Sequence, residues 1–385
     1  MVTRREFGKL ALAGLPATLL ARSESMFGAF AQAKPNSLIE GVQIGTITYS
    51  YRSMPDQSAQ ATLRYIVDSG ISAIELMGGP VESFAGAPLP AGRGGGGGRG
   101  AGGAAGAPAG GGRGPNAAPA PAPAQVLGSA SPPGTWNGQP CPPAPQAGGG
   151  GRRGGGRGDM TPEQQAAQQD QAAKLKAWRT SVSMDAFKKL RAMYNEAGVT
   201  IYAWKQLSPN MSDEEFEYVF NVAEALGCTH TTLELPTDPA QLKRIGEFAI
   251  RKKIYAAYHT HAQGSMTAFD EAFARSKGNM ANVDFGHWVA AGNVGGTPMQ
   301  FLQKYHSRIS SFHLKDRTTP EHCALNLPWG TGETPIREIL QLVKKNGWKM
   351  PATVELEYTI PEGSDAVREV GRCVDYCRQA LTART

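Results

Sequence analysis

Two short motifs in the last third of the chain carry side chains suited to metal binding and proton transfer. Asp284 and His287 form a D-x-x-H motif at the end of the apolar run NMANVDF. His313, Lys315 and Asp316 form an H-x-K-D motif at the end of the apolar run RISSFHL. Carboxylates and imidazoles without thiolates favour Mn, Mg, Co, Fe or Zn as ligand partners. The motifs therefore predict a divalent metal ion, and the residue types leave its identity open.

The histidines of the chain are concentrated around these motifs. The first 229 residues contain none, and all seven lie between residues 230 and 322. Histidines that served packing alone would be scattered more evenly. We expect His230, His306 and His322 to be structural, and the other four to belong to the site.

The elements that must position the motifs follow from the pattern of apolar runs. Each motif closes a run of strand type, and a helical run joins the two, which is typical of a parallel strand, helix, strand unit. Eight such strand runs alternate with helices along the chain, at residues 41–52, 71–79, 199–207, 228–236, 253–264, 279–285, 308–314 and 351–360. We predict a (β/α)8 TIM barrel, in which the carboxyl ends of the strands form the mouth that carries the active site. A doubly wound open sheet is the alternative, but YSYRSMPDQS is not the glycine-rich turn that it would need after the first strand.

More polar residues lie near the ends of other predicted strands. Glu355 and Glu357 share one face of the last strand run, and His259 and His261 share one face of the fifth, because strand side chains alternate. Glu355, Glu357 or His259 is placed to accept a proton from a carbon next to a carbonyl. Lys205, at the end of the third run, is placed with Lys315 to stabilise a developing oxyanion.

The remaining candidates are predicted to contact a substrate at the barrel mouth. They are His261, His287, Lys315, Glu75 and Trp288. Purely structural roles are the alternative for several of these residues. Asp284 is of a type that caps the helix that follows it, and Glu75 and Lys205 can serve as ion-pair partners.

A long insert separates the second predicted strand from the third. Residues 85–158 consist mainly of Gly, Ala, Pro and Arg, in runs such as GRGGGGGRGAGG and APAPAPA. This composition buries too little apolar surface to offset the entropy of ordering, so we predict a disordered insert in the barrel domain, residues 34–385. We expect that residues 90–155 can be deleted with little loss of stability. Residues 134–141, GTWNGQPC, are an island of structural character that is expected to touch the barrel mouth.

The N-terminus has the features of an export signal. Arg4 and Arg5 precede a short apolar stretch at residues 10–21, and residues 31–33 read Ala-Gln-Ala. The stretch is shorter than the ~20 apolar residues of a membrane span, so residues 1–33 are predicted to be a twin-arginine signal peptide and the protein to be periplasmic or secreted. No other run is long and apolar enough to span a bilayer.

Charge and cysteine content exclude two classes of protein. The net charge is +6, and the insert alone holds six arginines and no acidic residue. The rest of the chain therefore has no excess of positive charge, which argues against a nucleic-acid-binding protein. The five cysteines form no C-x-x-C motif and no dense disulfide framework. Cys373 and Cys377 lie four residues apart in a predicted helix, where a disulfide is geometrically unfavourable.

The motifs VDFGHW, SFHLKD, HTH and VELEY resemble those of the xylose isomerase-like barrel superfamily of sugar phosphate isomerases and epimerases. The resemblance covers the chain from residue 38 to the C-terminus, apart from the insert. Relatives such as the ketose 3-epimerases hold one divalent ion with Glu, Asp, His and Glu from strands five to eight. The resemblance implies that Asp284, His313 and either Glu355 or Glu357 are ligands here.

The fifth strand departs from the epimerase pattern. His259 or His261 stands where those enzymes have a glutamate, and Glu234 on the fourth strand is a possible substitute carboxylate. The resemblance implies a metal-dependent sugar isomerase or epimerase that abstracts a proton beside a carbonyl. A lyase or hydratase of keto-sugars or keto-glycosides is the alternative; a phosphodiester endonuclease and a non-catalytic sugar-binding barrel fit the residues less well. The expected partner is a small carbohydrate, with no nucleic acid and an unassigned oligomeric state.

Overall fold

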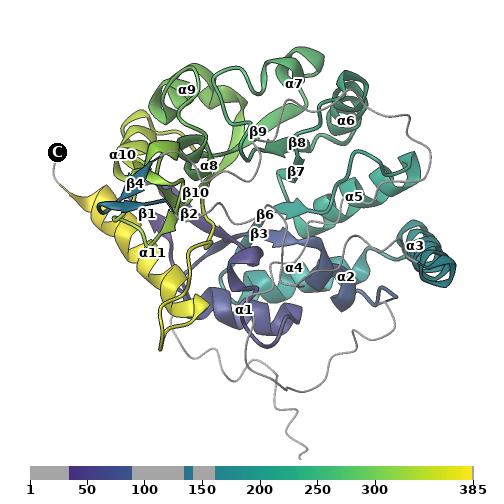
Figure 1. Ribbon diagram of the computed structural model, residues 1–385. Helices are drawn as coiled ribbons and strands as arrows, with labels where there is room; N and C mark the ends of the chain where they lie inside the picture. The colour runs from purple at the N-terminus through teal and green to yellow at the C-terminus, as the bar shows by residue number, and fades with distance from the viewer. Residues whose placement is uncertain (1–33, 89–133, 142–160, 384–385) are drawn as a thin grey trace, which may run out of the picture. The chain divides into compact units, whose positions relative to one another are not determined.

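The computed structural model of the protein describes residues 34–88, 134–141 and 161–383. Within these residues, eight parallel strands alternate with helices and close into a barrel (Figure 1). The barrel strands are β2 (Val42–Ile47), β3 (Ala73–Met77), β6 (Thr200–Lys205), β7 (His230–Glu234), β8 (Tyr255–His259), β9 (Asn279–Asp284), β10 (Ile309–Leu314) and β13 (Ala352–Val354). The predicted (β/α)8 TIM barrel is confirmed.

The barrel is closed by the pairing of its first strand with both its second and its last. Strand β2 pairs in parallel with β3, through Thr46 and Ile74, and with β13, through Thr46 and Val354. Inside the barrel, the hydroxyl groups of Tyr202 and Thr353 lie 2.8 Å apart, and both residues are buried. Each strand therefore has neighbours on both sides, and all eight carboxyl ends face one mouth.

Helices cover the outer face of the barrel, as the apolar periodicity of the sequence requires. They are α1 (Ala59–Asp68), α2 (Gly78–Phe84), α3 (Pro162–Ser181), α4 (Asp185–Glu196), α5 (Asp213–Leu226), α6 (Pro239–Lys252), α7 (Asp270–Arg275), α8 (Phe285–Ala290), α9 (Pro298–Tyr305), α10 (Ile336–Asn346) and α11 (Ala366–Thr382). Helix α5 shows why such segments begin and end where they do. Ser212 and Glu215 form a capping box at its start, and Gly227 ends it in a left-handed conformation.

Several short strands and 3-10 turns lie in the segments that flank the barrel strands. They are β1 (Leu38–Ile39), β4 (Thr135–Trp136), β5 (Gln139–Pro140), β11 (Asp316–Arg317), β12 (Asn326–Leu327), and the 3-10 turns η1 (Thr48–Tyr51), η2 (His306–Arg308) and η3 (Pro320–His322). The β11–β12 ribbon belongs to the loop that follows β10 at the mouth. The carboxylate of Asp316 accepts hydrogen bonds from the backbone amides of Gly330 and Gly332, at 2.8 and 2.9 Å, and so anchors the end of this loop.

The island at residues 134–141 is a small hairpin of β4 and β5 that is bonded to the loop after β10. A disulfide joins Cys141 to Cys323, and the rings of Trp136 and His322 lie 5.9 Å apart. The expected contact with the barrel mouth is thus present. The disulfide is a reason to revise the deletion prediction for residues 90–155, because Cys141 lies among them and is covalently bonded to Cys323 of the barrel. Residues 89–133 and 142–158 of the insert, like the predicted signal peptide at residues 1–33, lie outside the described residues.

The other cysteines in the described residues, Cys228, Cys373 and Cys377, are buried and unpaired, as expected for the last two. Among the helices that the structure describes, none has the length and apolarity needed to cross a membrane.

Candidate active site

Four side chains from four strands meet at the carboxyl ends of β8, β9, β10 and β13. They are His259, Asp284, His313 and Glu355, here called the four-residue cluster. All four are buried, and each contributes a ligand-type atom within 4.8 Å of those of the others. These residues include one of the two predicted histidines of the fifth strand and one of the two predicted glutamates of the eighth. The structure therefore brings together a plausible set of ligands from positions more than 90 residues apart in the chain.

His313 lies between two carboxylates. Its Nδ1 donates to Glu355 Oε2 at 2.7 Å, and its Nε2 donates to Glu75 Oε2 at 2.8 Å. Burial alone would lower the pKa of His313, but the charges of Glu75 and Glu355 outweigh it and raise the pKa to about 10. Burial alone would raise the pKa of Glu75, but His313 brings it down to about 2. Without a metal, the three groups form a buried carboxylate, imidazolium, carboxylate array.

Lys315 neutralises the remaining carboxylates of the site. Its Nζ lies 3.1 Å from Asp284 Oδ2, 3.0 Å from Glu355 Oε2 and 2.7 Å from Glu357 Oε2. Although burial lowers it, the pKa of Lys315 is raised overall by these carboxylates. The pKa of Glu355 is well below its usual range because Lys315 and His313 outweigh the effect of burial. Lys315 and Glu357 are thus direct neighbours of the four-residue cluster.

Asp284 combines the two roles that the sequence allowed. Its Oδ1 accepts a hydrogen bond from the backbone amide of His287 at 2.7 Å, so it caps helix α8. Its Oδ2 faces the cluster, where it lies near Lys315 but makes no hydrogen bond within the described part of the chain. The cap therefore holds the carboxylate in place and leaves one oxygen directed at the site.

His259 presents a free nitrogen to the same space. The amide nitrogen of Asn282 donates to Glu75 Oε2 and to Ser311 Oγ, each at 3.1 Å, so the amide oxygen of Asn282 faces His259 Nδ1 at 3.4 Å. This arrangement places the His259 proton on Nδ1 and the lone pair on Nε2. Nε2 is buried and has no hydrogen-bond partner among the residues that the structure covers. Burial, with help from Lys205 and His313, holds the pKa of His259 well below its usual range, so the ring is neutral.

The donor set fits a divalent ion. Two carboxylates and two imidazoles converge; Asp284 Oδ2 is paired with the ammonium of Lys315, whereas His259 Nε2, also a ligand type, has no hydrogen-bond partner in this part of the structure. An uncompensated buried acceptor is costly unless something pairs with it. Glu234 lies outside this cluster: it is bound to Lys205 at 2.9 Å and lies 3.4 Å from His261 Nδ1. The structure thus favours His259 over Glu234 as the group that completes the predicted metal site.

The predicted substrate contacts differ in how exposed their side chains are at the barrel mouth. His261 is half exposed, and the side chain of His287 is 14% exposed, so both border the open side of the site. Trp288 is fully buried, packs on Phe285 and Phe301, and donates from its ring nitrogen to Gly296 O. It is a core residue, which corrects its prediction as a substrate contact.

Glu75 also faces away from a substrate. It is fully buried, with His313, Thr232 and Asn282 bonded to its carboxylate. A side chain with no exposed atom and both oxygens engaged positions its neighbours, so the prediction of Glu75 as a substrate contact is corrected as well. Of the three histidines expected to be structural, His230 is buried against Ser311, His306 stacks on Trp348, and His322 is half exposed beside Glu333.

Arg317 is a site residue that the sequence reasoning missed. It follows the H-x-K-D motif directly, and its Nη1 lies 2.7 Å from His287 Nδ1, while its Nη2 donates to Ala324 O. Burial lowers the pKa of its guanidinium, which still carries its charge. The signal that could have found it is its position directly after the H-x-K-D motif, which ends at a strand end.

The fold and this site define a barrel with a metal-competent mouth, and comparison with known proteins agrees at the level of the family. The model of the family described as xylose isomerase-like TIM barrel matches residues 178–376, more than half of the chain. The chain belongs to this family. No curated protein matches the sequence.

Solved structures match this chain at low sequence identity, and one of them reaches a TM-score of 0.50. The probable 3-DHS dehydratase AsbF of Bacillus anthracis superposes with a TM-score of 0.50 at 12% identity, over 89% of this chain and 100% of that one. A sugar phosphate isomerase/epimerase of Parabacteroides distasonis gives a TM-score of 0.49 at 13% identity, over 92% and 97% of the two chains. A xylose isomerase domain protein of Planctomyces limnophilus gives 0.42 at 15% identity, over 52% and 84%. At these identities the likeness concerns the fold alone.

Proposed function

We propose that this protein is an exported, metal-dependent sugar isomerase or epimerase that removes a proton from the carbon beside a carbonyl group. The observation that carries the proposal is the four-residue cluster, which joins two carboxylates and a neutral imidazole with a free nitrogen at the mouth of a barrel of this family. His259, Asp284, His313 and Glu355 would hold the ion. When bound, such an ion polarises a sugar carbonyl and acidifies the neighbouring C–H group.

The two glutamates of the eighth strand have different parts in this proposal. Glu355 is 8% exposed and is held by His313 and Lys315, which suits a metal ligand. Glu357 is 22% exposed and is held by Lys315 at 2.7 Å, so its carboxylate is accessible from the mouth. Glu357 is therefore the proposed proton acceptor. Lys315, fixed between the two carboxylates, supplies positive charge for the developing oxyanion.

For His313 to act as a ligand, one of its ring nitrogens must give up its carboxylate. Nδ1 is bonded to Glu355, which belongs to the four-residue cluster. Nε2 is bonded to Glu75, which does not belong to it. We propose that Nδ1 turns to the ion while Nε2 keeps its hydrogen bond to Glu75. A metal-ligating histidine commonly donates its second nitrogen to a carboxylate in this way.

Export is supported by two independent features. The twin arginines are a receptor-read address, and the Cys141–Cys323 disulfide is of a kind that persists in oxidising compartments. An exported enzyme would meet free or oxidised sugars more often than phosphorylated ones. The proposed substrate is therefore a small unphosphorylated sugar or keto-sugar.

The variants Glu355→Gln and Glu357→Gln test the division of roles. We expect Glu355→Gln to lose bound metal, and Glu357→Gln to keep the metal and lose exchange of the substrate proton with solvent. Elemental analysis measures the metal content of each variant, and nuclear magnetic resonance measures the exchange of the substrate proton with solvent, so the two roles are tested separately. Equal metal loss in both variants, or full exchange in Glu357→Gln, would contradict the assignment.

A further inference from the structure

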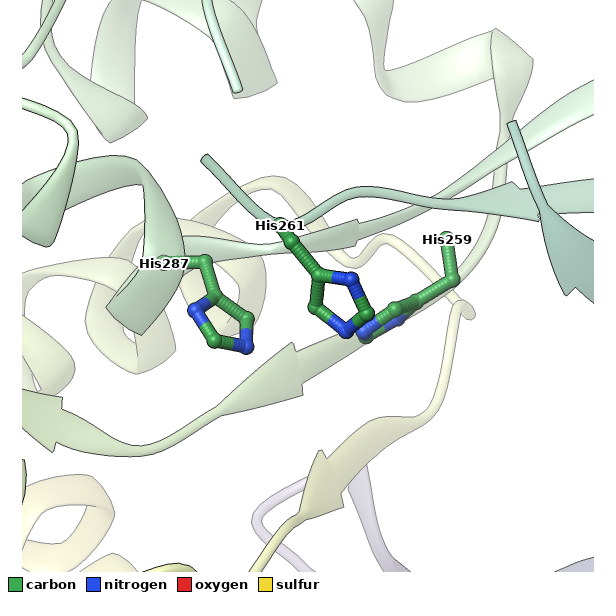
Figure 2. A group of neighbouring side chains, drawn as sticks. All are labelled: His259, His261 and His287. Carbon is green, nitrogen blue, oxygen red and sulfur yellow. The ribbon is translucent and has the colours of Figure 1, made fainter. Parts of the chain in front are cut away.

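Next to the four-residue cluster lies a second group of potential metal ligands, made of imidazoles alone. His259, His261 and His287 offer ring nitrogens that all lie within 4.8 Å of one another. The ring centroids are 4.9 Å apart for His259 and His261, and 4.7 Å apart for His261 and His287. Figure 2 shows the three side chains converging, with the ring of His261 between the other two. This group is called the three-histidine cluster.

We propose that the three-histidine cluster is a second metal site, which binds a zinc-like transition ion and competes with the four-residue cluster for His259. Three imidazoles without a carboxylate favour Zn, Cu, Ni or Co over Mg and Mn. The four-residue cluster, with its two carboxylates, accepts the harder ions. The two sites share His259, but metal binding to the three-histidine cluster can be measured without a substrate.

Two of the three rings have a nitrogen available to an ion. His261 Nδ1 lies 3.4 Å from Glu234 Oε2, and Glu234 is held in turn by Lys205. In the proposed site, this carboxylate accepts the Nδ1 proton of His261 and leaves Nε2 to the ion. The Nε2 of His259 is the buried nitrogen that no described residue pairs with. Glu234, predicted as a ligand, thus acquires the role of orienting one.

His287 is the ring that must be released. Lys315 Nζ lies 3.0 Å from its Nε2, and Arg317 Nη1 lies 2.7 Å from its Nδ1. Both neighbours are donors, and a neutral imidazole has one acceptor nitrogen, so His287 cannot satisfy them together. If Lys315 and Arg317 turn away from His287, Lys315 still has its ion pairs with three carboxylates, and Arg317 still has its hydrogen bond to Ala324 O. His287 is therefore held by a contact that is easily exchanged for an ion.

The two clusters exclude each other because they share one lone pair. His259 Nδ1 carries the proton that faces Asn282, so Nε2 is the nitrogen available to either site. An ion in the three-histidine cluster withdraws His259 from the four-residue cluster. The identity of the ion thus decides which cluster is filled.

The experiment uses the full-length protein stripped of metal, titrated separately with Zn²⁺ and Mn²⁺ by calorimetry. His261→Gln removes a ligand of the three-histidine cluster and none of the other, and Asp284→Asn does the reverse while keeping a side chain that can cap α8. We expect His261→Gln to weaken Zn²⁺ binding by about tenfold or more and to leave Mn²⁺ binding unchanged. We expect Asp284→Asn to weaken Mn²⁺ binding and to spare Zn²⁺.

Electron paramagnetic resonance of bound Cu²⁺ gives a readout of the ligands themselves. The nitrogen hyperfine pattern should indicate three imidazoles in the unaltered protein and one fewer in His261→Gln. The proposal is overturned if His261→Gln changes neither Zn²⁺ affinity nor this pattern, or if Asp284→Asn weakens both ions equally. Either result would mean that one cluster binds every ion. Proton exchange on the substrate plays no part in these measurements, so they stand or fall independently of the proposed reaction.

Discussion

Glu75, in the middle of the second barrel strand, and His313, near the end of the seventh, form a fully buried ion pair with a distance of 2.8 Å between Oε2 and Nε2. The pair joins Glu75 to a member of the four-residue cluster and holds the His313 ring by its Nε2. Glu75 is held in turn by Thr232 and Asn282, so its position is fixed from three strands. The proposed seventh-strand ligand is thus oriented by a carboxylate that is fully buried.

This pair predicts how the stability of the metal-free protein depends on pH. The pKa of Glu75 is about 2, against an ordinary 4.5, so its contribution is present above pH 4.5 and lost as pH falls toward 2. The pKa of His313 is about 10, against 6.5, so its contribution is present below pH 6.5 and lost as pH rises toward 10. Urea unfolding in the presence of a chelator should show highest stability between these limits and a decline above pH 6.5.

Glu75→Gln is the matched variant. It keeps the size of the side chain and removes the charge, so we expect a loss of about 1–3 kcal/mol near pH 6, where a buried partner of His313 is left imperfectly bonded. Its stability should also vary less above pH 6.5 than that of the parent. An unchanged free energy of unfolding, with an unchanged pH profile, would show that the pair contributes nothing.

Metal content is predicted to depend on the four-residue cluster. A stoichiometric divalent ion should copurify with the protein, and Asp284→Ala or His313→Ala should remove most of it, because each deletes a proposed ligand. Trp288→Phe is a control, since Trp288 is buried outside the cluster and should leave metal content unchanged. Elemental analysis measures the metal content of the parent and the variants. Full metal retention in both alanine variants would show that Asp284 and His313 have structural roles only.

The hairpin at residues 134–141 is predicted to stabilise the barrel through its disulfide. Cys141→Ser should lower the free energy of unfolding by about 2–4 kcal/mol, because the bond closes a loop between residues 182 apart in sequence. A reducing agent should destabilise the parent by a similar amount and leave Cys141→Ser unaffected. Deleting residues 90–132 and 143–158 while keeping the hairpin should cost little, whereas deleting residues 90–155 should cost as much as the serine variant. Equal stability of the two deletions would contradict this.

Export is predicted to require the paired arginines. Arg4→Lys combined with Arg5→Lys should retain the protein in the cytoplasm, because the export receptor distinguishes arginine from lysine at this site. Cell fractionation with an antibody measures the distribution. Undiminished periplasmic protein in the double variant would rule out the twin-arginine route.

The fold and part of the site follow from the sequence because both depend on local pattern. Strand and helix periodicities, with polar residues at strand ends, predict the barrel and the neighbourhood of Asp284, His313 and Glu355. Contacts between residues far apart in the sequence have no local pattern that predicts them: His313 and Glu75 are 238 residues apart, and Cys141 and Cys323 are 182 apart. The sequence also cannot tell whether an aromatic residue in the short helix after a strand, such as Trp288 in α8, turns to the mouth or to the core. The outcome depends on which helix face packs inward.

The central claim is proton abstraction beside a carbonyl, and solvent deuterium measures it directly. An accepted sugar or keto-sugar incubated with the metal-loaded protein in heavy water should take up deuterium at the carbon next to its carbonyl, and the uptake should vanish on chelation and in Glu357→Gln. A lyase, which shares the first step, would instead show a primary isotope effect on loss of that hydrogen. Turnover of an identified substrate with neither deuterium uptake nor an isotope effect would contradict the mechanism and favour hydrolysis.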